Sequence, residues 1–301
     1  MVVEPRRDHS FRIPRPDLSV KLGTPNACTQ CHTERTNEWA AAATKKWYGT
    51  ERRQRTHYGE AIHAGRRGAV NAERLLTALA KDRSQPAIAR ATAGSLMQGY
   101  ISPVTLPVLN TLLHDPDPLV RVSALNAIDA LPPQNKMRSA QHLLTDPVRV
   151  IRIEAARVLA DARRLLPATE KAAPENAAKE YIETLRENAD RPETHANFGG
   201  LLVRLQNPKE AEAAYKKAID IDPNFVPAYV NLADLYRAQN KDAEAKKLLL
   251  EAIKIQPDNG SLRHAYGLLL VRQKRLTDAI SALKKAIDLA PNNTRYRYVY
   301  A

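Results

Sequence analysis

Long apolar runs are absent from this chain, and glycine and aromatic residues are scarce. The 301 residues include 11 glycines and only 5% aromatic side chains, whereas alanine and leucine are plentiful. This composition favours helices over sheets. No stretch approaches the roughly 18 apolar residues that a membrane-spanning helix needs, and the first residues lack the apolar core of a signal peptide. We therefore expect an all-α protein without a transmembrane segment.

Motifs of common enzyme active sites are also absent. The chain has no glycine-rich phosphate loop, no G-x-S-x-G and no H-E-x-x-H. It has only two cysteines, and both belong to the motif described below, which leaves no further thiol as a nucleophile. These absences argue against an enzyme of the common classes.

The net charge of +13 is spread along the chain and not gathered in one tail. Residues 1–58 carry a net charge of +5, and residues 59–170 and 171–301 carry +4 each. A nucleic-acid-binding protein usually concentrates its basic residues on one face or tail. The distribution therefore predicts a well-solvated basic surface and no nucleic-acid ligand, with acidic protein partners or an anionic membrane surface as the alternatives.

Both cysteines fall in one five-residue window, the C-x-x-C-H formed by Cys28, Cys31 and His32. A disulfide between them would close a very small loop and stabilise little. A zinc site would need a second cysteine or histidine cluster, and a thioredoxin-like pair would need flanking strands. Covalent haem uses all three side chains, because each thiol adds to one vinyl group of the porphyrin and the histidine is the proximal iron ligand. The motif therefore favours one haem c, with metal or redox use as the alternative.

From about residue 70 a helical pattern recurs every 31 residues. The recurring positions are Arg90, Arg121 and Arg152 and, three residues later, Ala93, Ala124 and Ala155. Asp-Pro steps precede the second and third copies, and we expect Asp115, Asp117 and Asp146 to cap the helices that follow. The pattern is similar to HEAT repeats, and it predicts that the arginines bond to the preceding loop or a carboxylate, as part of the scaffold.

The last third of the chain repeats every 34 residues. Pro223, Pro257 and Pro291 mark the period, which is typical of tetratricopeptide (TPR) repeats. Three further sets of positions keep the register. They are the small residues Gly199, Ala233 and Gly267, the alanines Ala211, Ala245, Ala279, Ala218, Ala252 and Ala286, and the larger Tyr215, Leu249 and Leu283.

A TPR array forms a superhelix whose concave face is lined by the first helix of each repeat. We expect that face to serve as a partner groove for a peptide or protein, with a plain scaffold as the alternative. Its expected lining is Ala196, Gly200, Val203, Val230, Asn231, Asp234, Arg237, His264, Leu268 and Val271.

The stretch DHSFRIPRPDLSVKLGTPNACTQCHTERTNEWAAAATKKWYG resembles the segment around the last haem site of exported multihaem c-type cytochromes. In that family HEAT-like and TPR repeats follow the haem segment in the same order. The resemblance implies electron transfer to a redox partner, a periplasmic or otherwise exported location in a bacterium, and further C-x-x-C-H motifs upstream. Because this chain has one such motif, no signal peptide and a last repeat that stops early, we expect an internal fragment of a longer protein.

The resemblance also implies a second histidine on the haem iron. The candidates are His9, which follows Asp8, and His57 and His63 in the next predicted helix. Trp39 and Trp47 lie eight residues apart on a predicted helix, so they share a face that either covers the porphyrin or packs a small domain.

The expected organisation is a haem-attachment segment at 1–58, HEAT-like repeats at 59–168, a linker at 169–174 and TPR repeats at 175–301. The preferred function is electron transfer by one covalently bound haem, with the solenoid docking the redox partner. Two alternatives are an interaction scaffold without functional haem and an accessory part of a multihaem reductase acting on nitrogen or sulfur compounds.

Overall fold

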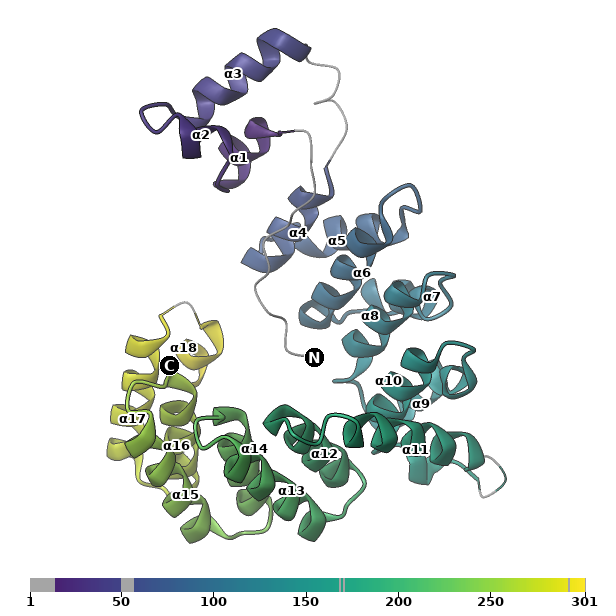
Figure 1. Ribbon diagram of the computed structural model, residues 1–301, viewed down its shortest axis with the longest axis vertical. Coiled ribbons are helices and arrows are strands. Elements are labelled where there is room, and N and C mark those ends of the chain that lie inside the picture. Colours follow the sequence, from purple (N-terminus) through teal and green to yellow (C-terminus); the bar gives the residue numbers. More distant parts are fainter. Residues whose placement is uncertain (1–13, 50–56, 168, 170, 292, 301) are drawn as a thin grey trace. The chain divides into compact units, whose positions relative to one another are not determined.

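Every regular element of the described chain is a helix (Figure 1). The computed structural model describes residues 14–49, 57–167, 169, 171–291 and 293–300, and no strand occurs within them. The chain divides into two compact units, one ending at Ile151 and one beginning at Arg152. Across the described ranges no helix combines the length and apolarity that a bilayer span requires. The all-α expectation is confirmed.

The first unit opens with three short helices that carry the cysteine motif. They are α1 (Pro16–Leu22), α2 (Cys28–Cys31) and α3 (Asn37–Tyr48). Gly23 ends α1 in a left-handed conformation, and the Thr36 hydroxyl caps α3 by accepting the N–H of Trp39. Pro16, Leu18 and Ala40 are buried where α1 packs on α3. The core of this part is therefore very small.

A stack of short helices completes the first unit. Its elements are α4 (Tyr58–Arg67), α5 (Ala72–Lys81), α6 (Ala87–Leu96), η2 (Met97–Tyr100), α7 (Thr105–Leu112), α8 (Pro118–Ile128), α9 (Pro133–Ala140), η3 (Gln141–Thr145) and the start of α10 (Arg149–Leu159). Leu76, Leu109, Leu125 and Ile128 are fully buried between these helices. The core is built of aliphatic side chains, as expected for close-packed helix pairs.

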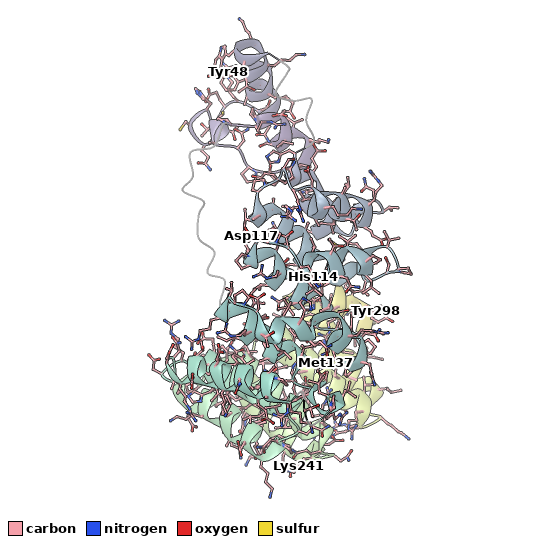
Figure 2. All side chains as sticks on the ribbon, turned by 90° about the vertical axis from the view of Figure 1, so that its right-hand side faces the viewer. Tyr48, His114, Asp117, Met137, Lys241 and Tyr298 are labelled. Carbon is pink, nitrogen blue, oxygen red and sulfur yellow. The ribbon has the colours of Figure 1, made fainter. Side chains whose placement is uncertain are left out.

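A ladder of arginine–aspartate pairs ties successive repeats together. Arg90 binds Asp115, and Arg121 lies 3.0 Å from Asp146, with all four side chains buried. The Arg121 guanidinium also donates to the Asp115 carbonyl at 2.7 Å. Asp117 caps α8 by accepting the N–H of Leu119 at 2.9 Å. Figure 2 labels the Asp117 side chain. Arg121 thus holds the preceding loop, as predicted, and Arg90 and Arg121 each bind the aspartate of the next repeat.

The second unit continues as regular helix pairs. Its elements are the rest of α10, η4 (Arg163–Leu165), α11 (Ala172–Arg186), α12 (Pro192–Arg204), α13 (Pro208–Ile221), α14 (Val226–Ala238), α15 (Asp242–Ile255), α16 (Gly260–Arg272), α17 (Leu276–Leu289) and α18 (Thr294–Tyr300). Helix α11 starts inside the stretch expected to be a linker. It packs through Tyr181 and Leu185 against Ala160 and Leu201.

The small and large positions of the 34-residue pattern meet inside each helix pair. A Cβ added to Gly199 would lie 2.6 Å from the Tyr215 ring, and one added to Gly267 would lie 2.7 Å from Leu283. Burial raises the pKa of Tyr215 to about 12, and the charge of Asp234 contributes to the same shift, so the hydroxyl stays protonated. The larger side chain of each second helix therefore occupies the space that its small partner leaves.

Two further features recur every 34 residues. Gln206, Asn240 and Lys274, each in the turn between the two helices of a pair, all adopt positive φ near 60°. At the turn that precedes each first helix, one side chain binds the carbonyl oxygen six residues before it. These pairs are His195 with Ala189, Tyr229 with Pro223, Arg263 with Pro257 and Arg297 with Pro291.

Candidate functional site

The C-x-x-C-H motif forms one helical turn with its side chains available. Asn26 holds the start of α2 by accepting the N–H of Cys28 at 2.8 Å, and it donates to the Asn37 side chain at 2.6 Å. Both cysteines are free thiols, Cys28 half-buried and Cys31 exposed. Residues three apart in a helix lie on the same face, so the two sulfurs point to one side.

A cavity of about 340 Å³ lies against this motif. Its walls are Ala27, Cys28, Cys31, His32, Trp39, Ala40, Ala43, Thr44 and Trp47. The His32 ring lies 5.0 Å from the Trp39 ring, and Trp47 is 68% exposed. The structure therefore brings both tryptophans and both thiols to one apolar hollow. These residue types fit one face of a porphyrin held by two thioethers.

The three candidates for the second iron ligand have different positions. His9 lies outside the described residues. His57 caps α4, because its Nδ1 accepts the N–H of Gly59 at 3.0 Å, and its ring centre lies 4.1 Å from that of the tilted Tyr58 ring. His63 is half-buried in α4. Neither His57 nor His63 is among the residues around the cavity, so the second ligand stays a prediction.

The expected partner groove contains a hollow of about 410 Å³ between α14 and α16. It is lined by Asp234, Arg237, Ala238, Leu268, Val271 and Arg272. Arg237 lies 3.4 Å from Asp234, and Arg272 lies 3.0 Å from Asp242. Burial raises the pKa of Asp234, although the charges of Arg237 and Arg295 oppose the shift.

The other expected groove residues are less open. Val203 is 42% exposed on α12, whereas Val230 and Asn231 are half-buried. His264 is only 6% exposed, because the Tyr296 ring of α18 stacks on it at 4.4 Å. The start of the fourth repeat therefore covers His264, which the sequence pattern placed on the open face.

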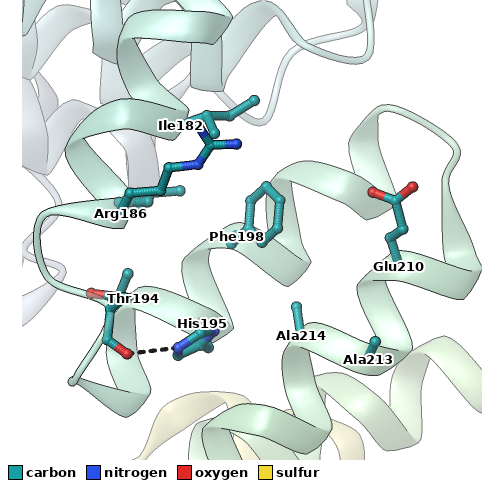
Figure 3. A pocket seen from close by; sticks show the side chains of 10 residues that line it. Ile182, Arg186, Thr194, His195, Phe198, Glu210, Ala213 and Ala214 are labelled. Carbon is teal, nitrogen blue, oxygen red and sulfur yellow. Dashed lines mark hydrogen bonds between the residues drawn. The ribbon is translucent and has the colours of Figure 1, made fainter.

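A second apolar pocket, of about 320 Å³, lies between α11 and α13 with α12 as its floor (Figure 3). Its lining residues are Ile182, Leu185, Arg186, Ala189, Thr194, His195, Phe198, Glu210, Ala213 and Ala214. Sequence reasoning missed this pocket. The available signal was a pair of alanines, Ala213 and Ala214, where the next repeat has Lys247 and Leu248.

Among the residues that the structure describes, no cluster of three or more His, Cys, Asp or Glu side chains could hold a metal ion. A metal held by protein side chains alone therefore has no candidate in those ranges.

Comparison with protein families identifies the repeats. Tetratricopeptide-repeat models match residues 173–224, 202–269 and 261–293. A HEAT-repeat model matches residues 105–131. Both repeat types that the spacing predicted are thereby confirmed. The first of these matches begins in α11. The first complete helix pair, α12 with α13, follows it.

The curated relatives are much longer than this chain. Protein O-mannosyl-transferase TMTC3 of Mus musculus is 31% identical over 139 residues, covering 41% of this chain and 15% of that protein. Tetratricopeptide repeat-containing protein trd-1 of Caenorhabditis elegans is 29% identical over 96 residues, covering 32% and 12%. The chain therefore spans a small part of these relatives.

The solved structures similar to this chain have lower sequence identity. TTC0263, a TPR protein of Thermus thermophilus, is 19% identical with a TM-score of 0.39, covering 64% of this chain and 93% of that one. MamA of Desulfovibrio magneticus RS-1 is 21% identical with a TM-score of 0.35, covering 49% and 81%.

Proposed function

Because the chain carries tetratricopeptide and HEAT repeats, we propose that it is an interaction scaffold that binds a partner protein in the groove between α14 and α16. The observation that carries this proposal is the hollow of about 410 Å³ on the first helices of two neighbouring repeats. Repeat arrays use such extended concave faces for binding.

The groove has the chemistry of a peptide-binding surface. Val271 is 44% exposed beside Leu268, which gives an apolar strip that a partner side chain would cover. Arg237 and Asp234 lie next to this strip and offer one cation and one carboxylate for the polar groups of a peptide. Apolar centres with polar rims are the usual anatomy of protein interfaces.

Peptide selection on the immobilised full chain tests the groove. Peptides recovered from a random phage library would be synthesised with a fluorophore, and their affinity measured by fluorescence anisotropy. Val271→Glu places a charge on the apolar strip, and we expect it to weaken these peptides by tenfold or more. Leu276→Glu is the matched control, because Leu276 is also an exposed aliphatic residue, 60% exposed, but lies outside the lining of the groove.

Failure of the selection, or equal weakening by Val271→Glu and Leu276→Glu, would contradict a groove-binding function. Unfolding curves of both variants check that neither charge disrupts the fold. Because both residues are exposed, we expect changes in stability within about 0.5 kcal/mol.

We also propose a second function, electron transfer by a haem c held at Cys28, Cys31 and His32. It is supported by the two free thiols, the adjacent histidine and the apolar cavity of about 340 Å³ beside them. Cys28 and Cys31 would form the thioethers, and His32 would ligate the iron. The bound haem would supply one-electron chemistry, while Trp39 and Trp47 would shield one face of the porphyrin from water. This proposal includes the exported location that the resemblance to exported c-type cytochromes implies.

Mass spectrometry tests the haem proposal independently of the groove. The chain is co-expressed with haem-maturation proteins, exported, and extracted with acid–acetone. We expect a covalent mass increase of one haem that Cys28→Ala with Cys31→Ala abolishes. Native mass with two free thiols in the matured protein would contradict the proposal and leave the scaffold function standing.

A further inference from the structure

We infer that the pocket between α11 and α13 is a second docking site, which takes an apolar anchor residue of a partner peptide flanked by one acidic and one basic residue. Its floor is formed by Thr194, His195 and Phe198, whereas the groove side of the same helix carries Ala196, Gly200 and Val203. Residues 198 and 200 lie about 200° apart around an α-helix. The pocket is therefore distinct from the groove.

The pocket exists because small residues stand where the next repeat has large ones. Ala213 and Ala214 of α13 correspond, 34 residues later, to Lys247 and Leu248 of α15. Ile182 and Leu185 of α11 form the opposite wall, and the half-buried Phe198 ring lies between the walls (Figure 3). The resulting space of about 320 Å³ is lined mainly by carbon and suits one aromatic or large aliphatic side chain.

Charge complementarity defines what flanks that anchor. Figure 3 shows Arg186 and Glu210 on opposite sides of Phe198. Within the described parts of the chain, no ion pair within 4.0 Å is found for either side chain. The pocket thus offers one unpaired cation at one rim and one unpaired carboxylate at the other. An acidic residue of the ligand would meet Arg186 and a basic one would meet Glu210.

His195 is already engaged and therefore shapes the rim. Its Nε2 lies 2.8 Å from the Ala189 carbonyl oxygen. A carbonyl oxygen only accepts, so this nitrogen carries the proton and the ring is fixed across the turn that precedes α12. The rim between α11 and α12 is therefore set before a ligand arrives.

A defined peptide tests the site in the full chain. The probe is a capped, fluorescein-labelled peptide in which one tryptophan lies between a glutamate and a lysine. We expect saturable binding with a dissociation constant below about 1 mM. Ala214→Leu fills the pocket with the side chain that the next repeat uses, and we expect at least tenfold weaker binding. Ala213→Lys, which copies Lys247, gives the same result if Ala214→Leu fails to fold.

Two controls test whether the pocket, and not the groove, binds the charged peptide. A probe with glutamine in place of both charged residues should bind about three- to tenfold more weakly, and Val271→Glu in the groove should leave the probe unaffected. The proposal is overturned by no saturable binding, by equal binding to a probe with alanine in place of tryptophan, or by equal binding to Ala214→Leu. It is also overturned if sedimentation shows a dimer of the chain that Ala214→Leu dissociates, because the occupant is then a second copy.

Discussion

At the scale of single residues, the turns between paired helices carry a conformational strain that recurs in every repeat. Gln206, Asn240 and Lys274 all have φ near 60°, a region that side chains other than glycine avoid because Cβ crowds the backbone. Asparagine tolerates it better than the others, and Asn240 also accepts a hydrogen bond from Arg272. A change to glycine would therefore relieve different amounts of backbone strain at the three positions.

We expect Gln206→Gly and Lys274→Gly to stabilise the protein by about 0.5–1 kcal/mol each, because the strain of a side chain at positive φ disappears. Chemical denaturation with urea measures the change. Asn240→Gly is the matched control, and it should gain less or lose stability because the bond to Arg272 is removed. Equal gains at all three positions would show that strain is not the cause.

The two glycines of the first helices make a second prediction. Gly199→Ala is expected to destabilise by about 1–3 kcal/mol, because the new Cβ would overlap the buried Tyr215 ring and force it to move. Gly267→Ala should cost less, because it meets Leu283, and the neighbouring repeat already combines Ala233 with Leu249. Urea denaturation of both variants provides the comparison. A larger loss for Gly267→Ala would contradict this explanation.

The arginine–aspartate ladder makes a third prediction at this scale. Arg90→Ala would leave the buried Asp115 without its partner, and such a loss typically costs about 3–5 kcal/mol. Burial alone would raise the pKa of Asp115, but hydrogen bonds from Arg90 and the Asp117 N–H outweigh it and lower that pKa. The stability that this pair adds is therefore present above about pH 4, the ordinary pKa of an aspartate, and is lost as the pH falls through the lowered value.

The measurement is urea denaturation at pH 7 and pH 3. Between these values the wild type should lose more stability than a variant in which Arg90 and Asp115 are both replaced, Arg90→Leu with Asp115→Asn. If both proteins have the same pH dependence, the ion pair is not the source.

At the scale of helices, an aromatic contact that helps to dock α18 is expected to depend on pH. The Tyr296 ring stacks 4.4 Å from His264, and its hydroxyl lies 2.9 Å from the Ser261 hydroxyl. Neither ring nitrogen of His264 has a hydrogen-bond partner among the described residues. Burial lowers the pKa of His264, and the charge of Arg295 lowers it further. The folded state thus prefers the neutral ring.

Docking of α18 should therefore weaken as the pH falls below about 6.5, because His264 takes up a proton once α18 no longer covers it. Hydrogen exchange of the α18 amides, corrected for intrinsic rates, is expected to accelerate between pH 7.5 and pH 5. His264→Phe keeps the stacked ring but cannot titrate, so its corrected exchange should not change. Equal acceleration in both proteins would exclude His264 as the cause.

At the scale of the whole molecule, the small core of α1–α3 predicts unequal stability. Both tryptophans of the chain lie on α3, so their fluorescence reports this part alone. Pro16, Leu18 and Ala40 supply its buried apolar area, which is too little for a stable independent core. In protein with free thiols, we expect the tryptophan transition in urea to come before the loss of helical circular dichroism. Coincident transitions would contradict this expectation.

The sequence was informative where the repeat period determines packing. The 34-residue spacing predicted the small and large partners, such as Gly199 with Tyr215, because each repeat must bury the same face against its neighbour. It also placed Asp234, Arg237 and Leu268 around one hollow. It misplaced His264, because the burial of that residue depends on Tyr296 in another repeat. It also missed the pocket at Ala214, since an absent side chain leaves no periodic signal.

An ion pair lies where the HEAT-like repeats meet the tetratricopeptide repeats. Arg152, the third arginine of the ladder, lies 2.8 Å from Glu180 of α11, where its two predecessors bind loop aspartates. At this junction the carboxylate partner of the arginine therefore lies on a helix and not in a loop. Inserting whole 31-residue repeats before α9 would leave the ion pair between Arg152 and Glu180 in place. We therefore expect the array of HEAT-like repeats to tolerate extra repeats at that point. Deleting α11 would instead remove this ion pair and the packing of Tyr181 and Leu185 against Ala160 and Leu201.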